Sequence, residues 1–135
     1  MKKSTALVLF AILATGCSTS TADLEKKTAA TAQTLTYSEN YQEIYRRVYT
    51  ASSRCVAGNI NAYASMNVDA QLYNELGYGE ITGSLVNVGV RNYYWKAKIE
   101  RAGQGSKMTI NSGNTLGANA TMKKVLSWAS GDQSC

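Results

Sequence analysis

Few residues in this 135-residue chain could do chemistry, because it contains three cysteines and no histidine. Without an imidazole it cannot build a Ser-His-Asp triad, a Cys-His dyad or an ordinary zinc-hydrolase site. Carboxylates remain: Glu75 and Glu80 flank a predicted turn, and Glu100 lies on another predicted hairpin. Glycoside hydrolysis needs two carboxylates on facing elements, whereas most carboxylates simply lie at the surface. We therefore predict no catalytic site, no metal site and no cofactor.

The stretch Leu13-Ala14-Thr15-Gly16-Cys17 ends a segment that starts with Lys2-Lys3 and continues through an apolar run. A charged start, a short apolar core and a small residue near the end are typical of a secretory signal too short to span a bilayer. With Cys17 directly after Gly16, the stretch resembles the lipobox of bacterial lipoprotein precursors, with Ala14 where leucine is usual. The alternative is an ordinary secretory signal that ends in a chance cysteine.

The resemblance implies cleavage between Gly16 and Cys17, a diacylglyceryl thioether on the Cys17 sulfur, and acylation of the freed amine by a chain such as palmitate. Two or three acyl chains would hold the protein on a membrane stably, since one chain binds only reversibly. Ser18 follows the cysteine, where an aspartate would resemble the inner-membrane retention signal of enteric bacteria. We therefore expect the periplasmic face of the outer membrane, if the organism is Gram-negative.

The other two cysteines, Cys55 and Cys135, are expected to form a disulfide, because paired cysteines in an oxidising compartment usually bond. The bridge would close a loop of about 80 residues and contribute about 4 kcal/mol in the chain-entropy model. It would also fix the last residue of the chain, where a terminus otherwise frays. Two free thiols are the alternative.

Charge argues against a nucleic-acid partner. The formal net charge is +5, and Lys2 and Lys3 of the predicted signal account for two of the positive charges. The remaining cations are spread along the chain, whereas nucleic-acid binding needs a denser basic patch.

The chain after the signal (residues 1–16) divides into two predicted parts. Residues 17–35 comprise the lipidated cysteine and a small, polar, aperiodic stretch, which predicts a flexible tether. A marginal helix over residues 22–34 is the alternative. Residues 36–135 are predicted to form one domain.

Two helices are predicted at the ends of this domain. Thr36 and Glu39 fit a capping box, and an apolar stripe with helical spacing follows until Gly58. A last helix is predicted to begin at Asn114 or Thr115 and to end at Gly131. The apolar stripe of the first helix comprises Tyr41, Ile44, Tyr45, Val48, Ser52 and Cys55.

Strands are predicted between the helices. Residues 59–72 alternate between apolar and polar types and predict one strand. A turn centred on Leu76-Gly77 would pair Leu72 with Ile81. A second turn at Gly103-Gln104 would pair Ile99 with Met108 and Glu100 with Lys107, so both faces of that hairpin agree on one register.

These elements together predict an α+β fold: a two-layer sandwich with an N-terminal helix, a four-stranded antiparallel sheet and a C-terminal helix. On the third strand, Tyr93 and Trp95 are predicted to face inward and Tyr94 outward. Tyrosine and cations are enriched at interfaces, so an exposed sheet face with such residues predicts a partner surface. Its members would be Tyr94, Lys96, Lys98, Tyr73 and Tyr78. A solvated sheet face without a partner is the alternative.

A short anchor, a tether and one small domain without a catalytic group set favour a non-enzymatic accessory or interaction module. Its partner would be another envelope protein or a cell-wall component. An inhibitor or binding module for a cell-wall hydrolase or glycan is the first alternative. A carboxylate-dependent cell-wall enzyme is the second.

Overall fold

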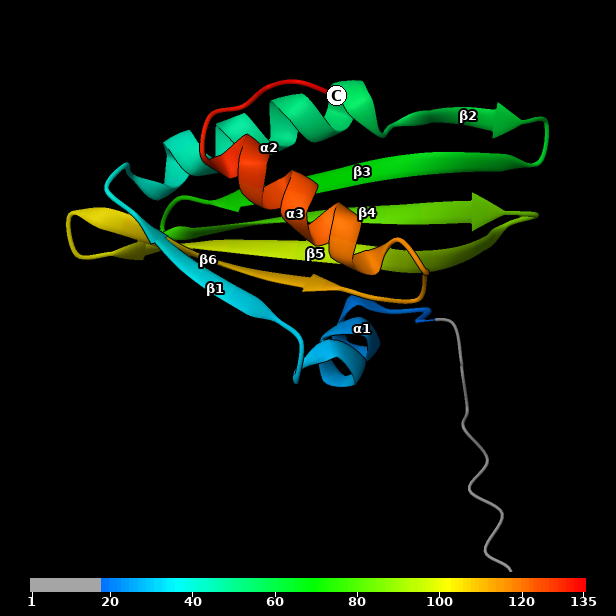
Figure 1. The fold of residues 1–135 in the computed structure, drawn as a ribbon, viewed down its shortest axis with the longest axis horizontal. Coiled ribbons are helices and arrows are strands. Elements are labelled where there is room, and N and C mark those ends of the chain that lie inside the picture. Colours follow the sequence, from blue (N-terminus) through cyan, green and yellow to red (C-terminus); the bar gives the residue numbers. More distant parts are fainter. Residues whose placement is uncertain (1–17) are drawn as a thin grey trace, which may run out of the picture.

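A six-stranded antiparallel sheet organises the chain in the computed structural model, which describes residues 18–135 (Figure 1). The predicted signal cleavage site and lipid attachment at Gly16 and Cys17 lie outside the described residues. The strand order is β1-β6-β5-β4-β3-β2. In chain order, the elements are α1 (Thr21–Thr28), β1 (Gln33–Tyr37), α2 (Tyr41–Cys55), β2 (Gly58–Asn61), β3 (Ala64–Tyr73), β4 (Tyr78–Asn87), β5 (Val90–Ala102), β6 (Gly105–Ser112) and α3 (Ala118–Ala129).

The predicted α+β class stands, but the predicted four-stranded sheet is wrong. One extra strand, β2, arises because the long alternating run of residues 59–72 contains a turn. The Asn61 side chain accepts a hydrogen bond from the Tyr63 amide at 2.8 Å, which favours a turn over an extended strand. The chain therefore reverses between β2 and β3.

The second extra strand, β1, lies in the stretch predicted to be a tether and the start of a helix. It pairs with β6 along its whole length, so Thr36 is a strand residue opposite Lys107. The following helix α2 begins later than predicted, because Asn40 caps it: its side chain accepts a hydrogen bond from the Glu43 amide at 2.9 Å.

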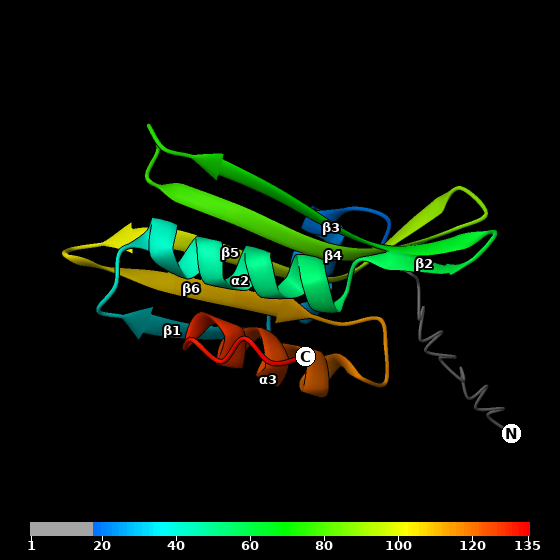
Figure 2. The same cartoon turned by 90° about the horizontal axis from the view of Figure 1, so that it is seen from above.

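The two faces of the sheet are covered differently. Helices α2 and α3 lie on one face, called here the inner face, and α1 lies on the opposite, outer face (Figure 2). The predicted two-layer sandwich thus becomes three layers over β5 and β6. Helix α1 is capped by Ser20, whose hydroxyl accepts from the Asp23 amide, and Leu24 is fully buried against the sheet.

The main core lies between the inner face and the two long helices. Trp95, Ile99 and Ile110 are buried on the sheet side, and Ile44 and Val125 are buried on the helix side. Trp95 fits because Gly83 is opposite: a Cβ atom there would lie 1.9 Å from the indole nitrogen. Close packing of this kind leaves no room for a side chain at position 83.

A β-bulge in β5 alters which side chains face which way. Gly83 pairs with Trp95 but Ser84 pairs with Tyr93, so Tyr94 is the extra residue without a partner in β4. The side chain of Tyr94 packs against the core, and Tyr93 faces the outer side. The predicted orientations of Tyr93 and Tyr94 are therefore reversed.

Candidate functional site

The disulfide between Cys55 and Cys135 is confirmed. The two Cα atoms lie 5.3 Å apart, and the bond joins the last residue of α2 to the last residue of the chain. The Trp128 indole donates a hydrogen bond of 3.0 Å to the Ser134 carbonyl, so the C-terminal segment is also attached to α3. The bridge is therefore structural.

The predicted partner surface is only partly assembled. The bulge turns Tyr94 into the core, and Lys96 is 7% exposed because α1 covers it. Neither residue can belong to an open docking surface. The remaining three come together: the Tyr73 and Tyr78 rings lie 4.8 Å apart, and the Lys98 ammonium lies 5.0 Å from the Tyr78 ring centroid. We call Tyr73, Tyr78 and Lys98 the tyrosine cluster.

Lys96 instead joins two elements of the outer face. Its ammonium lies 2.5 Å from Glu25 of α1 and 2.9 Å from Glu80 of β4. Burial would lower the pKa of Lys96, but the hydrogen bonds to Glu25 and Glu80 outweigh it and raise the pKa above its ordinary value. Lys96 is therefore held as a cation that fastens α1 to the sheet.

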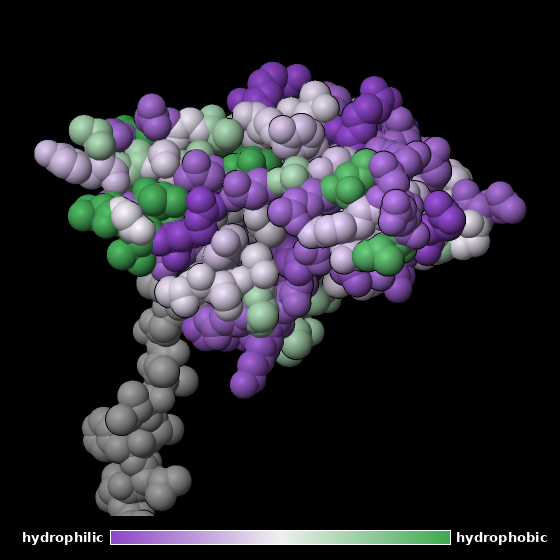
Figure 3. All heavy atoms as spheres, turned by 180° about the vertical axis from the view of Figure 1, so that it is seen from behind, coloured by the Kyte–Doolittle hydropathy of each residue, from purple (hydrophilic) through white to green (hydrophobic). Residues whose placement is uncertain are grey.

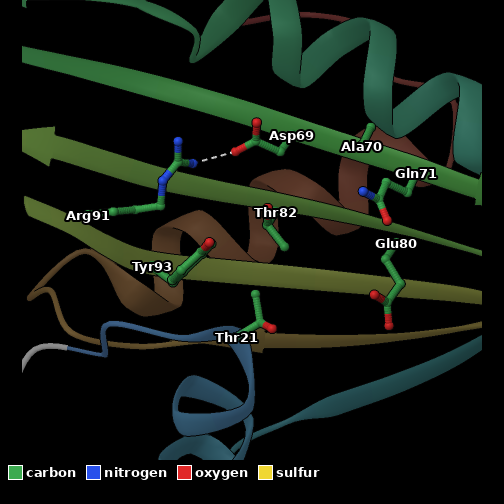
Figure 4. A pocket seen from close by; sticks show the side chains of 8 residues that line it. All are labelled: Thr21, Asp69, Ala70, Gln71, Glu80, Thr82, Arg91 and Tyr93. Carbon is green, nitrogen blue, oxygen red and sulfur yellow. Dashed lines mark hydrogen bonds and ion pairs between the residues drawn. The ribbon is translucent and has the colours of Figure 1, made fainter.

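A polar hollow of about 380 Å³ lies on the outer face beside the start of α1 (Figure 4). We call it the outer-face hollow. Arg91 lies at one end, where its guanidinium contacts Asp69 at 2.5 Å and the Ser84 hydroxyl at 2.9 Å. The guanidinium also lies 5.9 Å from the centroid of the Tyr93 ring. The lining residues are Thr21, Asp69, Ala70, Gln71, Glu80, Thr82, Arg91 and Tyr93.

The hollow and the tyrosine cluster are continuous along the outer face. Tyr73 and Gln71 lie on the same face of β3, and the Tyr73 hydroxyl donates a hydrogen bond to the Gln71 side chain. Gln71 also lines the hollow, opposite Glu80 of β4. The outer side of β3, β4 and β5 therefore presents tyrosine rings, carboxylates, an amide and two cations together.

Sequence reasoning missed most of the hollow, including Asp69, Arg91 and Tyr93. The alternation in β3 places Asn67, Asp69 and Gln71 on one polar face, which was the available signal. Arg91 and Tyr93 join that face only because the bulge shifts the phase of β5 between Tyr93 and Trp95.

The candidate carboxylates lie in different environments. Glu100 contacts Lys98 at 2.9 Å and Lys107 at 3.4 Å, and the hydrogen bond from Lys98 is the main reason that its pKa is lowered. A carboxylate held in its ionised form is a poor proton donor. Glu80 is bound by Lys96, and Glu75 is exposed in the loop between β3 and β4.

Comparisons with known proteins give no relative: no family model matches the chain, and neither a curated protein nor a solved structure is similar to it. Among the helices of residues 18–135, none has the length and apolarity to cross a membrane. The same residues contain no group of three or more histidine, cysteine or acidic side chains that could hold a metal ion.

Proposed function

We propose that this protein is a lipoprotein of the bacterial cell envelope, cleaved after Gly16 and acylated on Cys17. The observation that carries the proposal is the disulfide between Cys55 and Cys135. Disulfides form in oxidising compartments, which supports export. The bridge uses both cysteines of residues 18–135, and the third cysteine of the sequence, Cys17, comes at the end of a signal-like segment. Ser18 after the cysteine favours the periplasmic face of the outer membrane.

The anchored domain acts as a non-enzymatic accessory module that binds another envelope protein or a cell-wall component. The outer face of the sheet supports this role, because the tyrosine cluster and the outer-face hollow form one open surface of aromatic and charged groups. Tyrosine and arginine are among the residue types that contribute most at protein interfaces. The partner surface is thus proposed on Tyr73, Tyr78, Lys98, Arg91 and Tyr93.

A second candidate, a glycan-binding module or an inhibitor of a cell-wall hydrolase, is favoured by the outer-face hollow itself. Its lining offers hydroxyl, amide, carboxylate and guanidinium groups around the Tyr93 ring. Convergent polar groups beside an aromatic face suit a polar ligand such as a sugar.

The anchor is tested by metabolic labelling with palmitate in wild type and in a Cys17→Ser variant. We expect the label in wild-type protein and its loss in the variant, with the variant released from the membrane fraction. Label that persists in the variant, or its absence from wild type, would refute acylation at Cys17.

The partner surface is tested by photo-crosslinking in intact cells from position 78, with position 123 on the exposed side of α3 as the matched control. We expect a discrete adduct from position 78 alone. Arg91→Ala should weaken the protein adduct at position 78, because Arg91 belongs to the proposed partner surface. It should weaken binding of soluble cell-wall fragments only if the glycan reading holds. Equal crosslinking from both positions would contradict the proposed surface.

A further inference from the structure

Five large apolar side chains are exposed at one end of the molecule, on three neighbouring turns. Tyr63 follows β2, Val88 lies in the turn between β4 and β5, Val90 begins β5, and Leu116 lies before α3. Val88 is 76% exposed and Leu116 is completely exposed. We call Ile60, Tyr63, Val88, Val90 and Leu116 the apolar tip. Figure 3 shows hydrophobic side chains gathered at this end, which carries the turns after β2 and β4.

The turns of the apolar tip are held together. The Val88 amide donates a hydrogen bond of 2.9 Å to the Tyr63 carbonyl, which joins the turn after β4 to the turn after β2. The Asn114 side chain donates to the Tyr93 carbonyl at 2.8 Å, which brings the loop with Leu116 to the start of β5. The apolar side chains are therefore displayed by ordered backbone.

Val88 has an unfavourable backbone conformation in the turn between β4 and β5. Its φ angle is +48°, in the left-handed region that a β-branched residue rarely enters. Asparagine or glycine is the usual residue at such a place in a two-residue hairpin turn. A strained residue with an exposed apolar side chain points to a function for that side chain, because solvent exposure alone offers it nothing.

The first described residue, Ser18, is attached to β5 near the same end. The Ser18 carbonyl accepts a hydrogen bond of 2.9 Å from the Tyr93 amide, and Ser18 is fully buried. From Tyr93 to the turn at Gly89 is four residues of extended chain, roughly 13 Å. An acyl group on Cys17, one residue before Ser18, would therefore bring the apolar tip to the membrane surface.

Charge is also consistent with a lipid surface. Residues 58–63, 87–90 and 113–118, which form the three turns, contain no charged side chain. Charged groups resist transfer from water into an apolar medium, so a surface that enters a bilayer interface should lack them. Valine, isoleucine and leucine suit the boundary between headgroups and acyl chains, and tyrosine suits the headgroup level.

We propose that the apolar tip is a second membrane contact, inserted into the bilayer interface beside the acyl anchor. This inference rests on the proposed acylation of Cys17, which supplies the proximity. The contact would fix the orientation of the domain: the turns after β3 and β5 would point away from the bilayer, and the outer face would stand at an angle to it, open to a partner.

The test uses the full-length lipidated protein in vesicles of phosphatidylethanolamine and phosphatidylglycerol that carry spin-labelled lipid. Val88→Trp reports on the apolar tip, and Leu76→Trp is the matched control, since Leu76 is 70% exposed on the turn at the opposite end. The native Trp95 and Trp128 are buried, so both variants share a constant background. We expect the lipid label to quench the Val88→Trp emission several-fold more than the Leu76→Trp emission.

Equal quenching of the two variants would overturn the proposal. So would a blue-shifted Val88→Trp emission that spin-labelled lipid does not quench, because protein and not lipid would then cover the tip. Mass spectrometry of the same sample distinguishes failure of the membrane contact from failure of the proposed acylation. Acylated protein with an unquenched tip refutes the membrane contact alone, whereas unacylated protein refutes the anchor.

A Val88→Asn variant separates folding from membrane contact. Asparagine tolerates the left-handed conformation, so its midpoint of thermal unfolding should equal or exceed that of wild type. In a Cys17→Ser background, Val88→Asn with Ile60→Asn should reduce the residual binding of the folded protein to vesicles. Unchanged residual binding would contradict a contribution from the tip.

Discussion

The backbone amide of Tyr93 donates a hydrogen bond of 2.9 Å to the carbonyl of Ser18, so the chain is attached to β5 from the first residue that the structure describes. Three residues further on, α1 begins and Leu24 packs on the sheet. A lipid on Cys17 would thus be joined directly to the folded domain, without the flexible linker predicted for residues 17–35.

This attachment predicts that α1 resists proteolysis. Leu24→Ala should lower the free energy of unfolding by about 2–5 kcal/mol, the usual cost of truncating a fully buried leucine. It should also speed trypsin cleavage after Lys26 and Lys27, whose side chains are already exposed, because the backbone of α1 would unfold more readily. Leu116→Ala is the control, because Leu116 is fully exposed and its truncation should change neither quantity. If trypsin cut wild type and Leu24→Ala equally fast after Lys26, the docking of α1 would be disproved.

Gly83 makes room for Trp95, which predicts a strict size limit in β4. Gly83→Ala should destabilise the fold by about 1–3 kcal/mol, the range for overpacking a filled core, and should alter the near-ultraviolet circular dichroism of the indole. Gly117→Ala is the control, since the nearest atom to a Cβ there is 3.8 Å away. A Gly83→Ala variant as stable as wild type would argue against this packing.

Glu100 predicts a loss of stability in acid. The hydrogen bond from Lys98, with a further contribution from Lys107, lowers its pKa in the folded protein below the ordinary 4.5. The unfolded chain therefore binds the proton first, and the stabilisation is complete above pH 4.5 and lost as the pH falls through the folded pKa. Urea unfolding at several pH values should show a shallower acid decline for Glu100→Gln. An identical decline in both proteins would exclude this carboxylate as a cause.

The disulfide predicts a large effect of reduction. Its 80-residue separation corresponds to about 4–5 kcal/mol in the chain-entropy model. A Cys55→Ser/Cys135→Ser variant should lose stability of this order by urea unfolding and should respond no further to dithiothreitol. Wild-type protein that keeps its full stability after complete reduction would show that the bridge is not structural.

The hairpin of β5 and β6 could be predicted in full, because its two faces specify the same register: Ile99 lies opposite Met108 and Glu100 opposite Lys107. The predicted register of the hairpin of β3 and β4 was wrong by two residues: Leu72 lies opposite Gly79 and not opposite Ile81. A shift of two keeps every side chain on its face, so hydrophobic alternation cannot detect it. The four-residue loop between Tyr73 and Tyr78 decides the register.

The first strand and helix could not be predicted from periodicity. Leu24 is the single large apolar residue of α1, and β1 is a short edge strand whose Leu35 is partly exposed. Their structure depends on tertiary contacts such as the ion pair between Glu25 and Lys96, which sequence alone does not reveal. The outer-face hollow could not be predicted either. The bulge at Tyr94 places Tyr93 on the outer face and Tyr94 on the inner face, the reverse of what simple alternation predicts.

The central claim is that Cys17 carries lipid, and intact mass spectrometry of the protein purified from membranes tests it most directly. We predict a mature chain that begins at Cys17, with a mass increase equal to a diacylglyceryl group plus an amide-linked acyl chain. A chain that retains residues 1–16, or one that begins near Cys17 with a free thiol, would contradict the account.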